Sequence, residues 1–163
     1  MRPMSTKSTS AGWRGKMVEE SGPSTAPLAV PHRWTQIRAD RLSGLALVIG
    51  APDTGKSTLA HYLYEMAART GQRVAFIDGD PGQSTLGPPT TITLALARRG
   101  DMSFPPTGEI RRYFIGNVSP RGHMLPLVVG ARRLLDEASR LGAETVIYDT
   151  CGLVDRAQGG HSL

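Results

Sequence analysis

The chain beyond position 42 contains three short, continuous apolar runs, at 45–49, 74–77 and 145–148. Such a run is typical of a strand that is buried on both faces, as the strands of a parallel sheet are. A shorter apolar run at 113–115 predicts a fourth strand. We therefore expect the core of the protein to be a largely parallel sheet.

Two stretches between these runs have helical periodicity. The apolar residues of 56–70 share one helix face, and those of 125–141 follow the same spacing. Gly71 and Gly142 come directly afterwards and are natural C-caps. A strand, a helix and a strand in succession predict parallel strands joined by a right-handed crossover. The predicted fold class is α/β, with a mostly parallel sheet and helices on both of its faces.

Two segments lack a readable periodicity. Residues 1–40 are rich in Ser, Thr, Gly and Pro, which predicts a disordered or loosely attached tail ahead of a single domain at 41–163. Residues 79–110 are rich in Gly and Pro, and their one apolar stretch, 92–97, does not show which element it forms.

Charge and cysteine content narrow the function classes. The formal net charge is +5, but residues 1–42 carry seven basic and three acidic side chains, so the domain itself is almost neutral. We interpret the basic residues as a solvated tail rather than a nucleic-acid-binding arm. The one cysteine, Cys151, allows no disulfide within the chain, and no apolar run reaches the ~18 residues of a membrane span. These features predict no membrane partner and a reducing, cytoplasmic location, or a nuclear one in a eukaryote.

The loop after the first predicted strand has the pattern of a phosphate-binding P-loop, Gly50-Ala51-Pro52-Asp53-Thr54-Gly55-Lys56-Ser57 followed by Thr58. Its two glycines let the backbone N–H groups point at phosphate oxygens, and the next helix adds its N-terminal dipole. Lys56, the one lysine beyond position 42, is expected to reach the β- and γ-phosphates of a nucleotide. Ser57 is expected to ligate Mg²⁺. The motif makes the fold a P-loop NTPase and predicts ATP with Mg²⁺ as its ligands.

Acidic residues follow two other predicted strands. Asp78 and Asp80 stand in Asp-Gly-Asp-Pro-Gly-Gln, one helix after the P-loop, where a carboxylate can face the γ-phosphate, accept a proton or hold Mg²⁺ through water. Asp149 ends the last predicted strand and occupies a Walker B position, which also predicts a Mg²⁺ contact. Thr150 and Gly152, just beyond it, could contact nucleotide or substrate.

Together these motifs resemble the P-loop domain of the polynucleotide 5′-hydroxyl kinases, whose members serve in pre-mRNA cleavage complexes and ribosomal RNA processing. The resemblance covers about residues 40–163. The segments that carry it are the P-loop, Asp80-Pro81-Gly82-Gln83, Ser119-Pro120-Arg121-Gly122-His123 and Thr150-Cys151-Gly152-Leu153.

The resemblance implies roles for individual residues. Asp80 would be the general base for the 5′-hydroxyl of RNA or DNA, Gln83 would hold the substrate end, and Thr150 and Gly152 would grip the terminal nucleotide. Two features depart from the family pattern. Leu153 stands where many members have a stacking tryptophan, and the arginine-bearing lid expected after this motif is not reached before residue 163. We therefore expect a fragment or a shortened product.

Two other functions fit the same motifs. Asp149-x-x-Gly152 also matches the γ-phosphate sensor of switch-type NTPases, although the base-specifying Asn-Lys-x-Asp of GTPases is not in the sequence. The protein could also bind ATP as a structural ligand and act as an assembly scaffold, with protein partners that the sequence does not identify.

Overall fold

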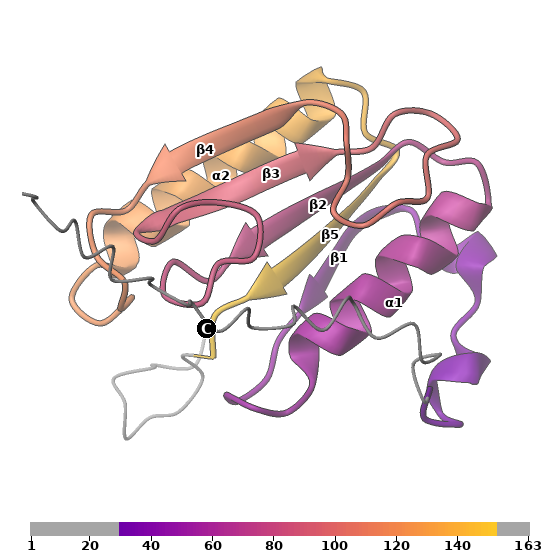
Figure 1. Cartoon of the computed structure of the whole chain (residues 1–163), viewed down its shortest axis with the longest axis horizontal. Coiled ribbons are helices and arrows are strands. Elements are labelled where there is room, and N and C mark those ends of the chain that lie inside the picture. Colours follow the sequence, from indigo (N-terminus) through magenta and orange to yellow (C-terminus); the bar gives the residue numbers. More distant parts are fainter. Residues whose placement is uncertain (1–29, 153–163) are drawn as a thin grey trace, which may run out of the picture. The chain divides into compact units, whose positions relative to one another are not determined.

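The computed structural model describes residues 30–152 (Figure 1). The predicted tail therefore lies mostly outside the described residues, as does Leu153. The chain divides into two units between Thr35 and Gln36, and both α-helices and all five strands belong to the second unit. In chain order the elements are the 3-10 helices η1 (Trp34–Gln36) and η2 (Ala39–Arg41), then β1 (Gly44–Val48), α1 (Lys56–Arg69), β2 (Val74–Gly79), β3 (Thr91–Leu96), β4 (Ile110–Phe114), α2 (Met124–Arg140) and β5 (Thr145–Thr150).

The five strands form one sheet in the order β1-β5-β2-β3-β4. β5 lies between β1 and β2 and is parallel to both, whereas β3 is antiparallel to its neighbours β2 and β4. Four strands therefore run in one direction and β3 runs against them. This arrangement confirms the predicted α/β P-loop fold with a mostly parallel sheet. The carboxyl ends of the parallel strands β1, β2 and β5 therefore lie on the same side of the sheet.

The two helices cover opposite faces of the sheet (Figure 1). Alternation along β5 shows the division, because Val146 and Tyr148 belong to the apolar core under α2 while Ile147 belongs to the core under α1. α2 packs over β2, β3 and β4, and α1 packs mainly over β5 and β2. Each helix thus buries its apolar stripe against one face, as the helical periodicity predicted.

The first strand departs from its predicted environment. We expected both faces of 45–49 to be buried, but Leu45, Leu47 and Ile49 are 51%, 46% and 60% exposed. β1 is an edge strand of the described sheet, and α2 is centred over β2–β4 rather than over β1. A continuous apolar run identifies a strand but not its place in the sheet, so the sequence could not distinguish an edge from a centre.

β3 is the strand that the sequence did not reveal. Every residue of Thr91–Leu96 is buried, and its neighbour β4 extends the expected short strand back to Ile110. Gly130 allows α2 to approach this part of the sheet closely, because a Cβ atom there would overlap the Tyr113 ring of β4.

None of the helices among residues 30–152 is long and apolar enough to cross a membrane.

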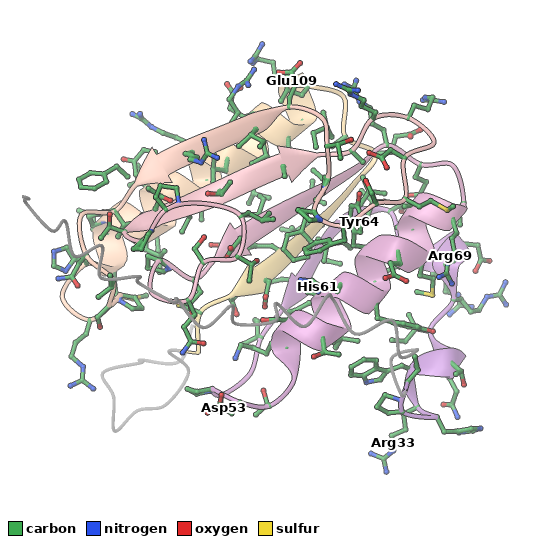
Figure 2. The ribbon with its side chains drawn as sticks, in the orientation of Figure 1. Arg33, Asp53, His61, Tyr64, Arg69 and Glu109 are labelled. Atoms are coloured by element: carbon green, nitrogen blue, oxygen red, sulfur yellow. The ribbon has the colours of Figure 1, made fainter. Side chains whose placement is uncertain are left out.

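An aromatic cluster joins α1 to the sheet and to the loop between β3 and β4. The His61 ring lies 3.8 Å from the Phe104 ring and 5.5 Å from the Phe76 ring, between centroids. His61 and Tyr64 are one turn apart on α1 (Figure 2), and the Tyr64 ring also contacts Phe104 at 5.6 Å. Burial lowers the pKa of His61, and the nearby charge of Glu65 opposes that shift.

We expect this histidine to make the protein less stable in mild acid. The pKa of His61 is lower in the folded protein than the value of about 6.5 that applies after unfolding, so the unfolded chain binds the proton more tightly. Its contribution to the free energy of unfolding is therefore complete above about pH 6.5 and is lost as the pH falls below that value. Urea unfolding at pH 7 and pH 5.5 measures the loss, and His61→Leu should reduce it. An equal loss in His61→Leu would contradict the assignment.

Candidate active site

The P-loop connects the end of β1 to the start of α1 and closes tightly on itself. Asp53 and Gly55 adopt positive φ angles of 59° and 82°, a conformation that glycine reaches without strain. The Thr54 hydroxyl and the Lys56 ammonium both donate to the Ala51 carbonyl oxygen, at 2.8 and 2.7 Å. Gly50 is needed for this closure, since a Cβ atom there would lie 2.9 Å from Thr54 Oγ1. The loop leads directly into α1, and the first N–H groups of a helix have no acceptor within that helix. These groups are free to donate to a phosphate.

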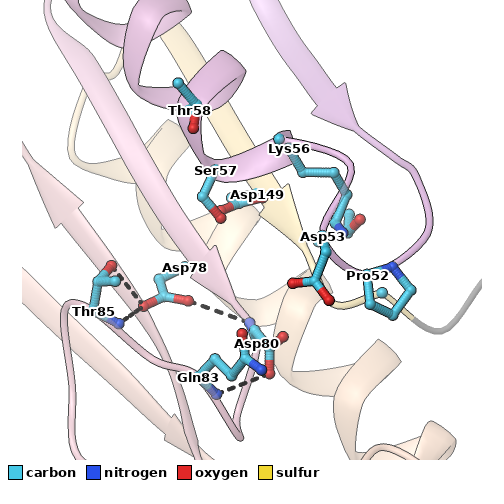
Figure 3. Close-up of a pocket in the computed structure, with 13 residues that line it drawn as sticks. Pro52, Asp53, Lys56, Ser57, Thr58, Asp78, Asp80, Gln83, Thr85 and Asp149 are labelled. Carbon is cyan, nitrogen blue, oxygen red and sulfur yellow. Dashed lines mark hydrogen bonds between the residues drawn. The ribbon is translucent and has the colours of Figure 1, made fainter. Parts of the chain in front are cut away.

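A cavity of about 280 Å³ lies at the sheet edge beside this loop (Figure 3). It brings together most of the residues that the sequence singled out, from three separate segments. Its lining consists of Pro52, Asp53, Gly55, Lys56, Ser57, Thr58, Asp78, Asp80, Gln83, Thr85, Asp149, Thr150 and Gly152. Gly50, Ala51 and Thr54 do not line it and instead shape the loop. Thr85 was not predicted, because it belongs to the segment 79–110 that showed no periodicity.

Asp149 lies in the second-to-last position of β5, beside Ser57 (Figure 3). Burial raises the pKa of its carboxyl above the usual range, and a hydrogen bond from the Ser57 hydroxyl opposes that rise. The charges of Asp78 and Asp80 also raise this pKa, whereas Lys56 lowers it. A cation close to Asp149 would therefore relieve both the burial and the repulsion between carboxylates.

The Asp149 carboxylate also has an unused oxygen. Asp149 Oδ1 and Thr93 Oγ1 are the two buried side-chain oxygens without a hydrogen-bond partner among residues 30–152. Buried polar atoms are rarely left this way, and an ion or a water molecule is a common explanation. The same residues contain no cluster of three or more His, Cys, Asp or Glu side chains that could hold a metal by themselves. Mg²⁺ does not require such a cluster, because it usually keeps several waters and binds through one or two carboxylates together with substrate phosphates.

Asp78 and Asp80 differ in their surroundings although only Gly79 separates them. Asp78 is 4% exposed, and both of its oxygens accept hydrogen bonds from the loop that follows β2. Asp80 lies within that loop, where its Oδ1 accepts from the backbone N–H groups of Gly82 and Gln83 at 2.9 and 3.1 Å. No hydrogen bond among the described residues uses Asp80 Oδ2. The metal role predicted for Asp78 stays a prediction, and the geometry leaves one Asp80 oxygen able to accept a proton.

Gly79 allows β2 and β5 to lie close together at the site. A Cβ atom on residue 79 would overlap the Tyr148 ring and would lie 2.8 Å from the Asp149 carbonyl oxygen. A side chain here must therefore push the end of β2 away from β5, and it would move the carboxylates on both strands.

We expect Gly79→Ala to lower both stability and activity. Overpacking of this kind destabilises a protein by about 1–3 kcal/mol. Thermal unfolding measures the first effect, and the rate of the phosphoryl transfer that the family resemblance leads us to expect measures the second. Gly100→Ala is the matched control, because Gly100 lies in open space with a φ of +81°, so alanine there strains a turn without touching the site. Equal transfer rates in the two variants would contradict the role given to Gly79.

Thr150 and Gly152 are tied into the framework of the site. The Thr150 hydroxyl donates to the Val48 carbonyl oxygen at 2.7 Å, which links the ends of β5 and β1. Gly152 packs against the P-loop, since a Cβ atom there would lie 2.7 Å from Pro52 Cγ. Both residues line the cavity. The grip on a terminal nucleotide that the family resemblance implied for them stays a prediction.

A second cavity, of about 320 Å³, adjoins the first. The two share Pro52, Asp80, Gln83 and Gly152. The rest of its wall comes from Gly82, Cys151 and the loop between β4 and α2, through Val118, Ser119 and Pro120. The sequence pointed to Ser119 and Pro120 only through the family resemblance, and it gave no sign of Val118. His123 of the same motif lies outside both cavity linings.

Comparison with known proteins agrees with this geometry. Residues 50–163, which make up more than half of the chain, match a family model described as the P-loop of the mRNA cleavage and polyadenylation factor CLP1. The chain belongs to this family. The resemblance to polynucleotide 5′-hydroxyl kinases predicted from the sequence is thereby confirmed.

Similar curated proteins carry two kinds of name. A polyribonucleotide 5′-hydroxyl-kinase of Pyrococcus furiosus is 40% identical over 111 residues, covering 66% of this chain and 30% of the relative. One of the same name from Methanocaldococcus jannaschii is 30% identical and covers 74% of this chain and 36% of the relative. A CLP1 homolog of Drosophila melanogaster is 29% identical and covers 76% and 31%. The chain thus spans about a third of the length of these curated relatives.

Proposed function

We propose that the protein transfers the γ-phosphate of ATP to the 5′-hydroxyl end of a polynucleotide. The observation that carries this proposal is the position of Asp80, which lines both the P-loop cavity and the adjoining cavity. A carboxylate at that boundary can contact a phosphate donor on one side and an acceptor hydroxyl on the other. RNA is the acceptor to test first, because relatives are named as polyribonucleotide kinases.

The P-loop would hold the donor. The backbone N–H groups of the loop and of the first turn of α1 favour phosphate oxygens. Lys56 lines the cavity, and its ammonium can leave the Ala51 carbonyl to contact the β- and γ-phosphates. This part of the proposal is supported by the P-loop residues that line one cavity.

Ser57 and Asp149 would hold Mg²⁺. Asp149 Oδ1 has no hydrogen-bond partner, and the Ser57 hydroxyl lies beside the same carboxylate. Both groups are suitable ligands for a hydrated divalent cation. When bound, the ion would neutralise charge on the β- and γ-phosphate oxygens. The role of the two side chains is to fix its position relative to the P-loop.

Asp80 would act as the general base. Its Oδ1 is held by two backbone N–H groups, and its Oδ2 would accept the proton of the 5′-hydroxyl. The 5′-oxygen then forms a bond to the γ-phosphorus as the bond from that phosphorus to the β,γ-bridging oxygen breaks, which releases ADP. Gln83, next to Asp80 in both cavities, would orient the acceptor end.

A switch-type NTPase is the second candidate. It is favoured by Gly152, which lines the P-loop cavity three residues after Asp149, as in the Asp-x-x-Gly element that senses a γ-phosphate. Such a protein would release the γ-phosphate to water and signal to a partner. The two candidates differ in the fate of that phosphate.

End-specific labelling tests the proposed kinase. The protein is incubated with Mg²⁺, γ-labelled ATP and an RNA oligonucleotide that carries either a 5′-hydroxyl or a 5′-phosphate. We expect label only on the 5′-hydroxyl oligonucleotide, and the DNA version of the same pair measures acceptor preference. Label on neither oligonucleotide, with ATP consumed, would overturn the proposal in favour of the NTPase.

A further inference from the structure

We propose that Asp78 is a positioning residue that folds the loop carrying Asp80 into its reactive geometry. This inference rests on the proposed function, because the geometry it explains is that of the proposed base. Nothing in the P-loop pattern assigns such a role, and the sequence alone suggested a metal contact for Asp78.

The hydrogen bonds of Asp78 join the start of the loop between β2 and β3, residues 80–90, to its middle. Its Oδ2 accepts from the backbone N–H groups of Thr85 and Leu86 at 2.6 and 3.1 Å and from the Ser84 hydroxyl at 2.9 Å. The Thr85 hydroxyl adds a longer bond of 3.3 Å to the same oxygen. Its Oδ1 accepts from the Asp80 N–H at 3.3 Å. One carboxylate therefore joins the first residue of the loop to three consecutive residues in its middle. Figure 3 shows the bonds from Asp78 to Thr85 and to Asp80.

These bonds account for the burial of an acidic group. Asp78 is 4% exposed and lies in register with Thr93 of β3 on one side and Asp149 of β5 on the other. A buried carboxylate is costly unless several donors surround it, and here the loop supplies them. Oδ2 thus accepts from four protein donors, whereas Oδ1 accepts from one.

A second set of hydrogen bonds, within the loop itself, fixes the Asp80 side chain. With the loop closed by Asp78, the N–H groups of Gly82 and Gln83 point at Asp80 Oδ1. The two ends of the loop are also joined directly, because the Thr90 N–H donates to the Pro81 carbonyl at 2.8 Å. Asp78 therefore orders the loop, and the loop in turn orders the base.

Graded substitution separates positioning from ligation. Asp78→Ala removes every acceptor, whereas Asp78→Asn keeps one oxygen that can still accept from the Thr85 and Leu86 amides but removes the charge. For a positioning residue we expect the transfer rate kcat to fall by about 100-fold in Asp78→Ala and by much less in Asp78→Asn, since a displacement near 1 Å has an effect of that size. Nucleotide affinity should stay within about threefold in both, because the P-loop is unchanged. Asp136→Ala, at an exposed position on α2, is the matched control.

Amide hydrogen exchange supplies a readout that does not require activity. The Thr85, Leu86, Gly82 and Gln83 amides should exchange at least about tenfold faster in Asp78→Ala than in the wild type or Asp136→Ala. Unchanged protection of these amides would overturn the proposal. Equal transfer rates in Asp78→Asn and Asp78→Ala would also overturn it. Two equally low rates would indicate a role that needs the charge, such as ligation, and two rates equal to that of the wild type would indicate no role.

Two further outcomes are distinguishable. If the wild-type protein transfers no phosphate, the proposed function fails, while the exchange data still decide whether Asp78 orders the loop. If Asp78→Ala does not fold, Ser84→Ala takes its place, because it removes one donor to Asp78 and the acceptor of the Gly87 N–H. We then expect faster exchange of the Gly87 amide and a decrease in kcat of about tenfold or less. No change in either would contradict the role.

Discussion

Replacing Asp80 by asparagine should lower the rate of phosphoryl transfer by about 10²–10⁴-fold, which is the range that a general base contributes. Asparagine keeps the shape of the side chain, and its oxygen can still accept from the Gly82 and Gln83 N–H groups that hold Oδ1 in the wild type. Its amide nitrogen cannot accept a proton from the 5′-hydroxyl. The loss should therefore appear in kcat, measured with a 5′-hydroxyl RNA oligonucleotide at saturating ATP.

Two controls make this result specific to the base. Nucleotide affinity of Asp80→Asn, measured by titration calorimetry, should stay close to that of the wild type, because the P-loop is unchanged. Asp136→Asn, the same substitution at an exposed position on α2, should transfer phosphate normally. A rate for Asp80→Asn within threefold of the wild type would contradict the assignment of Asp80 as the base.

Replacing Lys56 by alanine should weaken nucleotide binding by about 10- to 150-fold, because a hydrogen bond to a charged group contributes about 1.5–3 kcal/mol. Lys56 is the one lysine among residues 30–152, and it lines the cavity from the first position of α1. Loss of its ammonium leaves the phosphates with the backbone donors alone. Titration calorimetry with a non-hydrolysable ATP analogue and Mg²⁺ measures the change.

Lys56→Arg and Arg132→Ala complete that experiment. Arginine keeps the charge, but its planar fork does not replace a compact ammonium inside a tight loop, so Lys56→Arg should recover little affinity. Arg132→Ala removes an exposed cation of α2 and should leave affinity unchanged. Equal losses in Arg132→Ala and Lys56→Ala would show that general attraction to positive charge, rather than the P-loop, explains the binding.

The features predicted correctly from the sequence are those that local patterns determine. The P-loop is encoded within nine consecutive residues, and its strand and helix follow from periodicity on either side. The three acidic positions were found because each follows a recognisable apolar strand. Their meeting in one cavity followed from the rule that parallel strands place their carboxyl ends at one edge.

The features that the sequence did not reveal depend on contacts between distant segments. β3 is buried because it lies between β2 and β4, yet its own residues sit in a Gly- and Pro-rich stretch without clear boundaries. The exposure of Leu47 depends on β1 being at the edge of the described sheet. Neither property can be inferred from the apolar pattern of one strand.

The different environments of Asp78 and Asp80 show the same limit within the site. Both precede a turn residue, so the sequence could assign either of them to a metal or to a proton. Only the folded loop shows that the Thr85 and Leu86 amides return to Asp78, which leaves Asp80 at the boundary of the two cavities. The sequence also could not predict that Val118 lines the second cavity, because Val118 belongs to a loop that is distant from Asp80 along the chain.

The fate of the γ-phosphate tests the central claim most directly. The wild-type protein, Mg²⁺, γ-labelled ATP and a 5′-hydroxyl RNA oligonucleotide are mixed, and label is measured on the oligonucleotide, as free phosphate and as remaining ATP. The account predicts that label moves to the oligonucleotide and that Asp80→Asn stops this transfer while still binding ATP. Label that stays on bound ATP, or appears only as free phosphate, would contradict it and would indicate a scaffold or a switch-type NTPase.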